Sequence, residues 1–216
     1  QLVQVLSTVS SLAPNARTRQ EILCELGDLY SHNLREVDKA KEAFEEALLL
    51  DENNVRVLRS LAGLHDEKGE WLGSIDLRKR AAKVLGETVS AIPLWMEIGT
   101  IEARHKNAPD LALKAFQKVV LLDPKNFEAL DAQAAIHRDR NNTKALLKVL
   151  KAQEALATPE EFGADRFVEL ATLVHNENNK TNKKALALYM KALALDPSLA
   201  GGLAGVDTIC RKEERW

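Results

Sequence analysis

The stretch EILCELGDLYSHNLREVDKAKEAFEEALLLD at residues 21–51 decides the fold of this chain, because it contains two amphipathic helical segments joined by a short turn. The first segment carries Gly27 in the middle of its apolar face. The second has the spacing A-x3-F-x2-A, formed by Ala40, Phe44 and Ala47. Where two helices cross, a small residue lets the backbones approach and a facing aromatic ring fills the adjacent space. The stretch therefore predicts a closely packed helical hairpin.

The same pattern recurs four more times along the chain. The small residues of the first helices are separated by 35, 37, 35 and 37 residues, and they are Gly27, Ala62, Gly99, Ala134 and Ala171. The later second-helix triplets are Ser74-Arg78-Ala81, Ala112-Phe116-Val119, Ala145-Val149-Ala152 and Ala185-Tyr189-Ala192. A two-helix unit repeated at this period cannot bury its apolar face alone. The sequence therefore predicts a stacked array.

The expected helices form five pairs. They cover residues 17–32 with 36–50, 54–68 with 71–85, 91–105 with 109–122, 126–139 with 142–156, and 161–176 with 181–195. Asp123-Pro124 and Asp196-Pro197 end two of the second helices, because proline cannot donate the helical N–H and restricts the residue before it. A last helix is expected over 199–214.

The predicted fold class is all-α, a right-handed superhelical solenoid of antiparallel helix pairs in one domain over residues 1–216. Apolar residues at helical spacing before Pro14 indicate half a repeat at the start. The five full repeats are expected at 20–53, 54–89, 90–125, 126–160 and 161–198, and the partial repeats at 1–15 and 199–216.

Three of the repeats carry a recognisable signature. The first has Leu23, Leu26, Gly27, Tyr30, Ala40, Phe44 and Ala47, the third has Trp95, Ile98, Gly99, Ala112, Phe116 and Pro124, and the fifth has Phe167, Leu170, Ala171, Ala185, Tyr189, Ala192 and Pro197. With these residues the chain resembles the tetratricopeptide repeat family, and it is similar to a segment of a longer, divergent array of the kind found in large bacterial proteins.

Four departures from that signature are predicted to matter. The first repeat has one extra residue in its turn, and the fourth is expected to be one residue short. Arg78 occupies a position where an aromatic residue is usual, and Gln133 occupies a normally apolar one. The second and fourth repeats are therefore expected to be the least stable.

The resemblance implies that first helices line a concave groove whose exposed positions bind a partner. The candidate partner-binding residues are Glu25, Asp28, Arg56, Arg59, Glu97, Thr100, Arg104, Glu128, Asp131, Arg138 and Glu169. Acidic side chains outnumber basic ones at the exposed first-helix positions, whereas lysines predominate on the later second helices. An acidic groove would favour a basic or amphipathic peptide by complementary potential. The alternative is that both faces are simply solvated.

One well-known form of the family holds a C-terminal carboxylate with Lys and Asn of the first helices. Here Cys24, Asp28, Arg59 and Gly63 occupy those positions, so this clamp is not expected. Arg56 and Arg59 could hold an acidic group between them, but two arginines three residues apart on a helix are more often ordinary surface charge.

The sequence favours a protein-interaction scaffold that binds a partner protein or peptide. A regulatory or spacer module of a larger multidomain protein is the alternative. An RNA-binding helical repeat is less favoured, because an acidic groove repels phosphates.

Metal binding, cofactors and catalysis are not expected. The five histidines, one near the end of each first helix, occupy different helical phases and would not converge on one ion; they are His32, His65, His105, His137 and His175. No P-loop, G-x-S-x-G or H-E-x-x-H motif occurs in the sequence.

The bulk properties give a few further expectations. A net charge of −2 provides no overall attraction to nucleic acid or membranes, and no apolar run reaches the roughly 18 residues of a membrane span. Cys24 and Cys210 lie too far apart in an array to form a disulfide, which favours a reducing cytoplasm. Exposed Leu2, Val5 and Leu6 could drive weak self-association.

Overall fold

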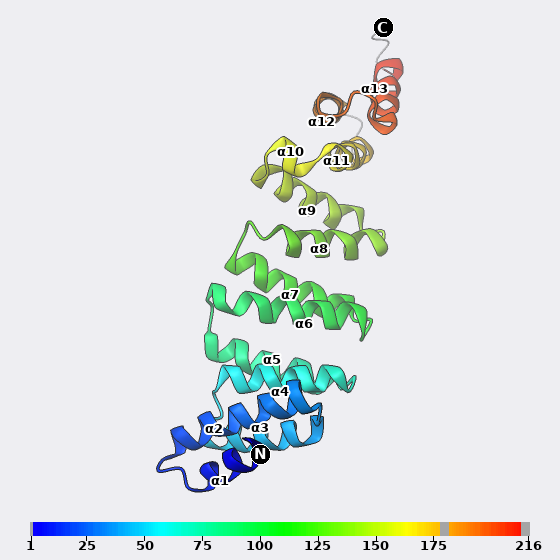
Figure 1. Ribbon diagram of the computed structural model, residues 1–216. Helices are drawn as coiled ribbons and strands as arrows, with labels where there is room; N and C mark the ends of the chain where they lie inside the picture. The colour runs from blue at the N-terminus through cyan, green and yellow to red at the C-terminus, as the bar shows by residue number, and fades with distance from the viewer. Residues whose placement is uncertain (1, 178–181, 213–216) are drawn as a thin grey trace. The chain divides into compact units, whose positions relative to one another are not determined.

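The computed structural model describes residues 2–177 and 182–212, and these residues contain helices and no strand. The chain divides into two compact units, unit 1 at residues 1–124 and unit 2 at residues 125–216. Within each unit the two helices of a pair lie antiparallel, and consecutive pairs are stacked (Figure 1). The predicted all-α array of helix pairs is confirmed.

Unit 1 contains three complete pairs. After α1 (Leu2–Ser11) they are α2 (Ala16–Asp28) with α3 (Val37–Leu50), α4 (Val55–Glu67) with α5 (Trp71–Leu85), and α6 (Ile92–Arg104) with α7 (Pro109–Leu122). Two short segments join them, the π-helix η1 (Leu29–Leu34) and the 3-10 helix η2 (Val89–Ala91). The observed bounds of α4 to α7 lie within one residue of the expected ones.

Unit 2 contains two pairs and a last helix. They are α8 (Phe127–Asp139) with α9 (Thr143–Leu156), and α11 (Ala164–Glu177) with α12 (Asn182–Leu195), followed by α13 (Ala200–Lys212). The short α10 (Pro159–Phe162) precedes α11, and Gly163 separates them with φ of 83°. The fifth first helix therefore begins later than expected. Residues 181 and 213–214, at the ends of two expected helices, lie outside the described residues.

In two of the hairpins, the two helices cross where a glycine of the first faces a phenylalanine of the second. A Cβ atom at Gly27 would lie 2.6 Å from Cε1 of Phe44, and one at Gly99 would lie 2.6 Å from Cε1 of Phe116. Both rings are buried. The backbones approach because the glycine side chain is absent, and the ring fills that space. The expected packing of these two crossings is confirmed.

The extra residue of the first repeat is accommodated in a π-helical segment. Residues 29–34 of η1 follow α2 directly, and a π turn holds one more residue per turn than an α turn. The N–H of Glu36 donates to the carbonyl oxygen of Tyr30 at 2.9 Å and closes the segment. The insertion is therefore absorbed at the end of the first helix.

In each of the first four repeats, the turn between the two helices contains one residue in the left-handed conformation. Arg35, Gly69, Asn107 and Asn141 have φ between 47° and 71°. Glycine and asparagine tolerate this conformation well, so three of the four positions carry a sequence signal. Arg35 carries none.

The expected triplet of the fourth repeat is wrong by one residue. Ala145 is partly exposed and Ala152 is exposed, whereas Leu146, Leu150 and Gln153 are buried. Leu146, Leu150 and Gln153 therefore take the place of the expected triplet, and Leu147 and Val149 of α9 are buried as well.

The geometry of the turn explains the shift. Three residues separate α8 from α9, as three separate α4 from α5. Leu146 follows Ala134 by 12 residues, and Ser74 follows Ala62 by the same interval. The fourth repeat thus has the spacing of the second, and its turn is one residue shorter than that between α6 and α7.

None of the described helices combines the length and the apolar character that crossing a bilayer requires. In α1, Leu2 and Val5 are 59% and 56% exposed, and Leu6 is partly buried. Self-association through this apolar edge stays a prediction.

Candidate functional site

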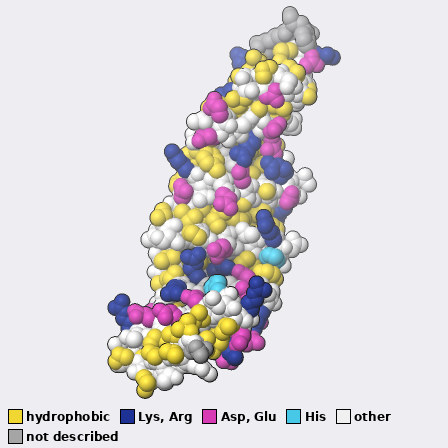
Figure 2. Space-filling model, in the orientation of Figure 1, with side chains coloured by type: hydrophobic (Ala, Val, Ile, Leu, Met, Phe, Trp, Pro, Cys, Tyr) yellow, Lys and Arg dark blue, Asp and Glu magenta, His cyan; other side chains and the backbone are white. Residues whose placement is uncertain are grey.

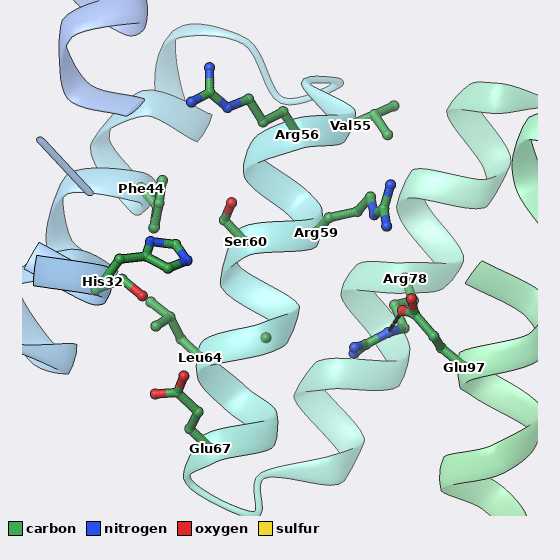
Figure 3. Close-up of a pocket in the computed structure, with 12 residues that line it drawn as sticks. His32, Phe44, Val55, Arg56, Arg59, Ser60, Leu64, Glu67, Arg78 and Glu97 are labelled. Atoms are coloured by element: carbon green, nitrogen blue, oxygen red, sulfur yellow. Dashed lines mark hydrogen bonds and ion pairs between the residues drawn. The ribbon is translucent and has the colours of Figure 1, made fainter. Parts of the chain in front are cut away.

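Unit 1 contains a hollow of about 580 Å³ along the first helix of its second repeat, which we name the α4 groove. Its wall consists of Ser31, His32, Phe44, Val55, Arg56, Arg59, Ser60, Gly63, Leu64, Glu67, Arg78 and Glu97. Three of the predicted site residues, Arg56, Arg59 and Glu97, are therefore brought together. Figure 3 shows Ser60 and Leu64 facing His32 and Phe44, with Arg59 extending toward the other side of α4.

The two arginines at the start of α4 differ in their surroundings. Nη2 of Arg56 lies 2.5 Å from Oδ2 of Asp28 on α2, and this hydrogen bond raises the pKa of Arg56. Arg59 is exposed and has no ion-pair partner among the described residues. Arg56 and Arg59 therefore do not form a preformed pair around an acidic group, and Arg59 is the cation that an incoming group could meet.

The floor of the α4 groove is smooth and partly apolar. A Cβ atom at Gly63 would meet no atom within 4 Å. Leu64 and Phe44 are buried beside it, and Val55 is partly exposed. An apolar floor with a few polar groups is the usual composition of a binding hollow.

A buried arginine closes one side of the α4 groove. Nε of Arg78 lies 2.5 Å from Oε2 of Glu97 on α6, and Nη2 lies 2.6 Å from Oδ2 of Asp66 on α4. Arg78 and Asp66 also each hydrogen-bond the hydroxyl of Ser74. Arg78 of α5 therefore connects its own hairpin to the next one, and the charge of Glu97 is already paired within the chain.

The other predicted residues of unit 1 lie outside the α4 groove. Glu25 and Asp28 line a neighbouring hollow of about 510 Å³ against Leu2 and Leu6 of α1. The hydroxyl of Thr100 donates to the carbonyl oxygen of Met96 at 2.9 Å, and Arg104 is exposed on the last turn of α6.

In unit 2 the predicted residues form two links between its repeats. Asp131 accepts hydrogen bonds from Nε2 of Gln153 at 2.7 Å and from Nη2 of Arg166 at 2.9 Å. Arg138 donates two hydrogen bonds to the Glu169 carboxylate, at 2.8 and 2.9 Å. Glu128, the remaining predicted residue of this unit, is exposed and has no ion-pair partner in the part of the chain that is described.

Internal pairing reduces the acidity of the predicted groove positions. Asp28, Glu97, Asp131 and Glu169 each contact an arginine from another repeat of their unit. On the face shown in Figure 2, acidic and basic side chains lie next to one another in both units. The excess of carboxylates in the sequence thus overstates the charge that a ligand would meet. Sequence reasoning missed these pairs because most of the partners lie 28 to 35 residues apart.

The histidines and cysteines have structural surroundings. The ring of His105 stacks on Trp71 with centroids 3.9 Å apart, and Nδ1 of His65 lies 2.5 Å from Oε2 of Glu70. Both cysteines are free, and burial raises the pKa of the Cys24 thiol, which keeps it protonated at neutral pH. Among the described residues no group of three or more potential ligands could hold a metal ion.

Comparisons with known proteins agree with this architecture. Residues 20–54 match the profile of the family described as tetratricopeptide repeat. Over 114 residues the chain is 32% identical to a protein of Arabidopsis thaliana named Protein CTR9 homolog, and this match covers 52% of the chain and 10% of that protein. The matched segment therefore represents about a tenth of the length of the curated relative.

Solved structures share the fold. A TPR repeats protein from Bacteroides fragilis is 13% identical, covers 89% of this chain and 98% of its own, and superposes with a TM-score of 0.65. YrrB, described as a TPR protein with an unusual peptide-binding site, is 19% identical, covers 86% of this chain and 91% of its own, and gives a TM-score of 0.51. At these identities the likeness concerns the fold.

Proposed function

We propose that this chain, which has the fold of a tetratricopeptide-repeat array, is a non-catalytic scaffold that binds a segment of a partner protein. The α4 groove is the site we favour, because three of the predicted residues, Arg56, Arg59 and Glu97, line this one hollow. Its volume of about 580 Å³ suits a few side chains of an extended or helical peptide. YrrB, whose structure shares this fold, is likewise described with a peptide-binding site.

The single observation that carries the proposal is the combination of Gly63 and Arg59. A Cβ atom added at Gly63 would meet no atom within 4 Å, so close packing of the hairpin does not require glycine there. Arg59, one turn earlier, has no ion-pair partner among the described residues. Open space beside an unpaired cation is what a bound segment with a complementary group would use.

The partner is proposed to be amphipathic. Val55 is partly exposed in the α4 groove and offers apolar contact, beside the buried side chains of Phe44 and Leu64. At the other end of α4, Glu67 is exposed and has no ion-pair partner in the described part of the chain, so a basic side chain of the segment could lie there. A preference for basic segments along the remaining first helices would rest on Glu25 and Glu128, since the other predicted carboxylates contact arginines.

The test is selection of peptides from a random displayed library against this chain, followed by affinity measurements on the enriched peptides. Gly63→Leu fills the open space and Arg59→Ala removes the unpaired cation. Each is expected to weaken binding about tenfold, which corresponds to roughly 1.4 kcal/mol. Glu67→Lys should weaken the peptides that carry a basic residue.

Lys148→Ala is the matched control, because Lys148 is exposed on α9 and lies outside the α4 groove. It should leave the affinity unchanged. Circular dichroism should show the same helix content for all variants. If no sequence is enriched, or if enriched peptides bind equally well to Gly63→Leu and Arg59→Ala, the α4 groove is not the binding site.

A second candidate is a regulatory or spacer module within a larger protein. The observation that favours it is the Arabidopsis thaliana relative, in which the matching segment makes up 10% of the protein. Deletion of this segment from its parent protein would then disturb the activity or assembly of the rest. If this chain, expressed separately, restored the behaviour of the shortened parent protein, that result would argue for an independent binding role.

A further inference from the structure

A second hollow of unit 1 is formed mainly by second helices, whereas the α4 groove follows a first helix. It has a volume of about 710 Å³ and is lined by Lys79, Ala82, Lys83, Gly86, Glu87, Trp95, Lys118, Leu121 and Leu122. Most of these residues come from the second helices α5 and α7, and Trp95 comes from the start of α6. It shares no residue with the α4 groove. We name it the α5–α7 hollow.

The charge of the α5–α7 hollow is positive, in contrast to the chain as a whole. Lys79 and Lys83 lie one turn apart on α5, are exposed, and have no ion-pair partner among the described residues. Nζ of Lys118 lies 4.0 Å from Oε1 of Glu87, and the two side chains are 50% and 91% exposed. An ion pair that is this long and this exposed contributes little, so Lys118 remains able to bind another carboxylate.

The interior of the α5–α7 hollow is apolar. Ala82 is buried, Trp95 and Leu122 are partly buried, and Leu121 is 75% exposed. Trp95 packs against the hydrophobic core of unit 1, which fixes its ring in place. A rigid aromatic side chain beside exposed leucine is a common anchor point for an apolar side chain of a partner.

We infer that the α5–α7 hollow is a second binding site, and that its occupant is an acidic segment of a partner protein that inserts one apolar side chain against Trp95 and Leu121. Lys79, Lys83 and Lys118 surround the apolar interior, so carboxylates on either side of the inserted residue would each meet a lysine. The sign of charge complementarity selects the partner, and apolar contact supplies most of the affinity.

Other polyanions fit the α5–α7 hollow less well. Single-stranded nucleic acid is bound along extended basic grooves with several exposed aromatic rings, and here one partly buried tryptophan and three lysines are present. Binding to an anionic lipid surface would be stabilised by only about 1 kcal/mol for each lysine. One exposed leucine would add little apolar contact. A peptide with alternating carboxylates and an apolar anchor uses every feature of the hollow.

The experiment measures the fluorescence anisotropy of a labelled peptide of Glu and Ser residues with a central Phe-Leu pair. Two comparison peptides replace Glu by Lys, or Phe-Leu by Ser-Ser. The acidic peptide with its apolar pair should bind, and both comparison peptides should bind at least tenfold more weakly. The double variant Lys79→Glu, Lys83→Glu should weaken the acidic peptide by a factor of about ten to a hundred, or roughly 1.4 to 2.8 kcal/mol. Leu121→Ser should weaken it by a smaller factor.

Controls separate this site from the α4 groove. Lys148→Glu reverses an exposed lysine on α9 and should leave the acidic peptide unaffected, as should Gly63→Leu in the α4 groove. Leu49→Ser replaces another exposed leucine, 88% exposed on α3, and should also have no effect. If the Gly63→Leu variant still binds the acidic peptide, the two sites are independent, so either proposal can fail alone.

The inference is overturned by any of three results. The acidic peptide could bind no better than the basic one, or its binding could survive Lys79→Glu with Lys83→Glu. Labelled single-stranded RNA or vesicles with anionic lipid could bind more tightly than the acidic peptide at physiological salt and lose binding with the same double variant. Circular dichroism of the variants verifies that each outcome concerns a folded chain.

Discussion

The hairpins of the second and third repeats, both in unit 1, use the same crossing position in different ways. In the third repeat, Phe116 of α7 fills the space left by Gly99 of α6. In the second, Arg78 of α5 occupies the corresponding position of the repeat, and its side chain is 9% exposed. One hairpin is closed by an aromatic ring and the other by a buried cation.

This difference indicates how each repeat obtains its stability. Phe116 contributes by burying apolar surface within its own hairpin. Arg78 instead contacts Asp66 of its own hairpin and Glu97 of the next, so its contribution depends on α6 being in place. Trp71 of the second repeat likewise stacks on His105 of the third. The second repeat is therefore built as a connector, and its polar contacts cost desolvation that the ring avoids.

The largest effect is expected from removing the ring. Phe116→Ala should lower the free energy of unfolding by about 3–5 kcal/mol, because it leaves a cavity against the backbone of Gly99. Denaturant unfolding followed by circular dichroism measures it. Leu49→Ala, at a position 88% exposed, is the control and should change stability by less than about 0.5 kcal/mol. Equal effects of the two variants would refute the aromatic crossing.

A smaller loss is expected from removing the cation. Arg78→Ala leaves Asp66 and Glu97 near one another without their partner, and it should cost about 1–3 kcal/mol, less than a fully buried pair because the carboxylates are 28% and 40% exposed. Hydrogen exchange should show the loss in α6 as well as in α4 and α5.

Substitution by a residue that fills volume without charge separates packing from pairing at this position. Arg78→Met should cost less than Arg78→Ala if volume matters most. If both variants left the protection of the α6 amides unchanged, the second repeat would not be a connector. An equal cost of Arg78→Met and Arg78→Ala would show that pairing outweighs volume at this position.

The next effect concerns two glycines in neighbouring first helices. Gly99→Ala places a Cβ atom 2.6 Å from the Phe116 ring and should destabilise by about 1–3 kcal/mol. Gly63→Ala meets no atom within 4 Å and should stabilise the interior of α4 by about 0.5–1 kcal/mol. Thermal unfolding of both variants, measured side by side, should shift in opposite directions. A stabilised Gly99→Ala would show that the crossing can relax.

Much of this architecture could be predicted from local pattern. Helix bounds and the Gly99–Phe116 contact follow from periodicity and from spacing within one hairpin, both of which the sequence contains. The π-helical segment η1 was signalled only as one extra residue, because its form depends on which turn absorbs the insertion. The packed face of α9 was misassigned since a one-residue shift changes which side chains are buried, and Leu146 and Ala145 are both compatible with a helix.

The candidate site was predicted less completely. Family positions placed Arg59 among the candidate binding residues, but pairing between repeats decides which charges a ligand meets. Asp28 with Arg56, and Glu97 with Arg78, come together only when one hairpin stacks on the next. A contact that depends on stacking has no signature in the spacing of one repeat, so the acidity expected from a side-chain count differs from that of the folded surface.

The smallest effect extends the comparison to the fourth repeat, where His137 of α8 occupies the position of Glu102 in α6. Burial, and to a lesser degree the charge of Arg140, lowers the pKa of His137 below its ordinary value of 6.5. Between the lowered pKa and about 6.5, the unfolded chain binds a proton that the folded chain does not, so the free energy of unfolding falls as the pH drops through this range. Denaturant unfolding, followed with a spectroscopic probe in unit 2, should show a lower free energy of unfolding at pH 5.5 than at pH 8. His137→Gln should reduce this difference. His32→Gln, at an exposed position, should retain the full pH dependence. Were His137→Gln to leave the pH dependence as large as His32→Gln does, protonation of partly buried His137 would not be what weakens this repeat in acid.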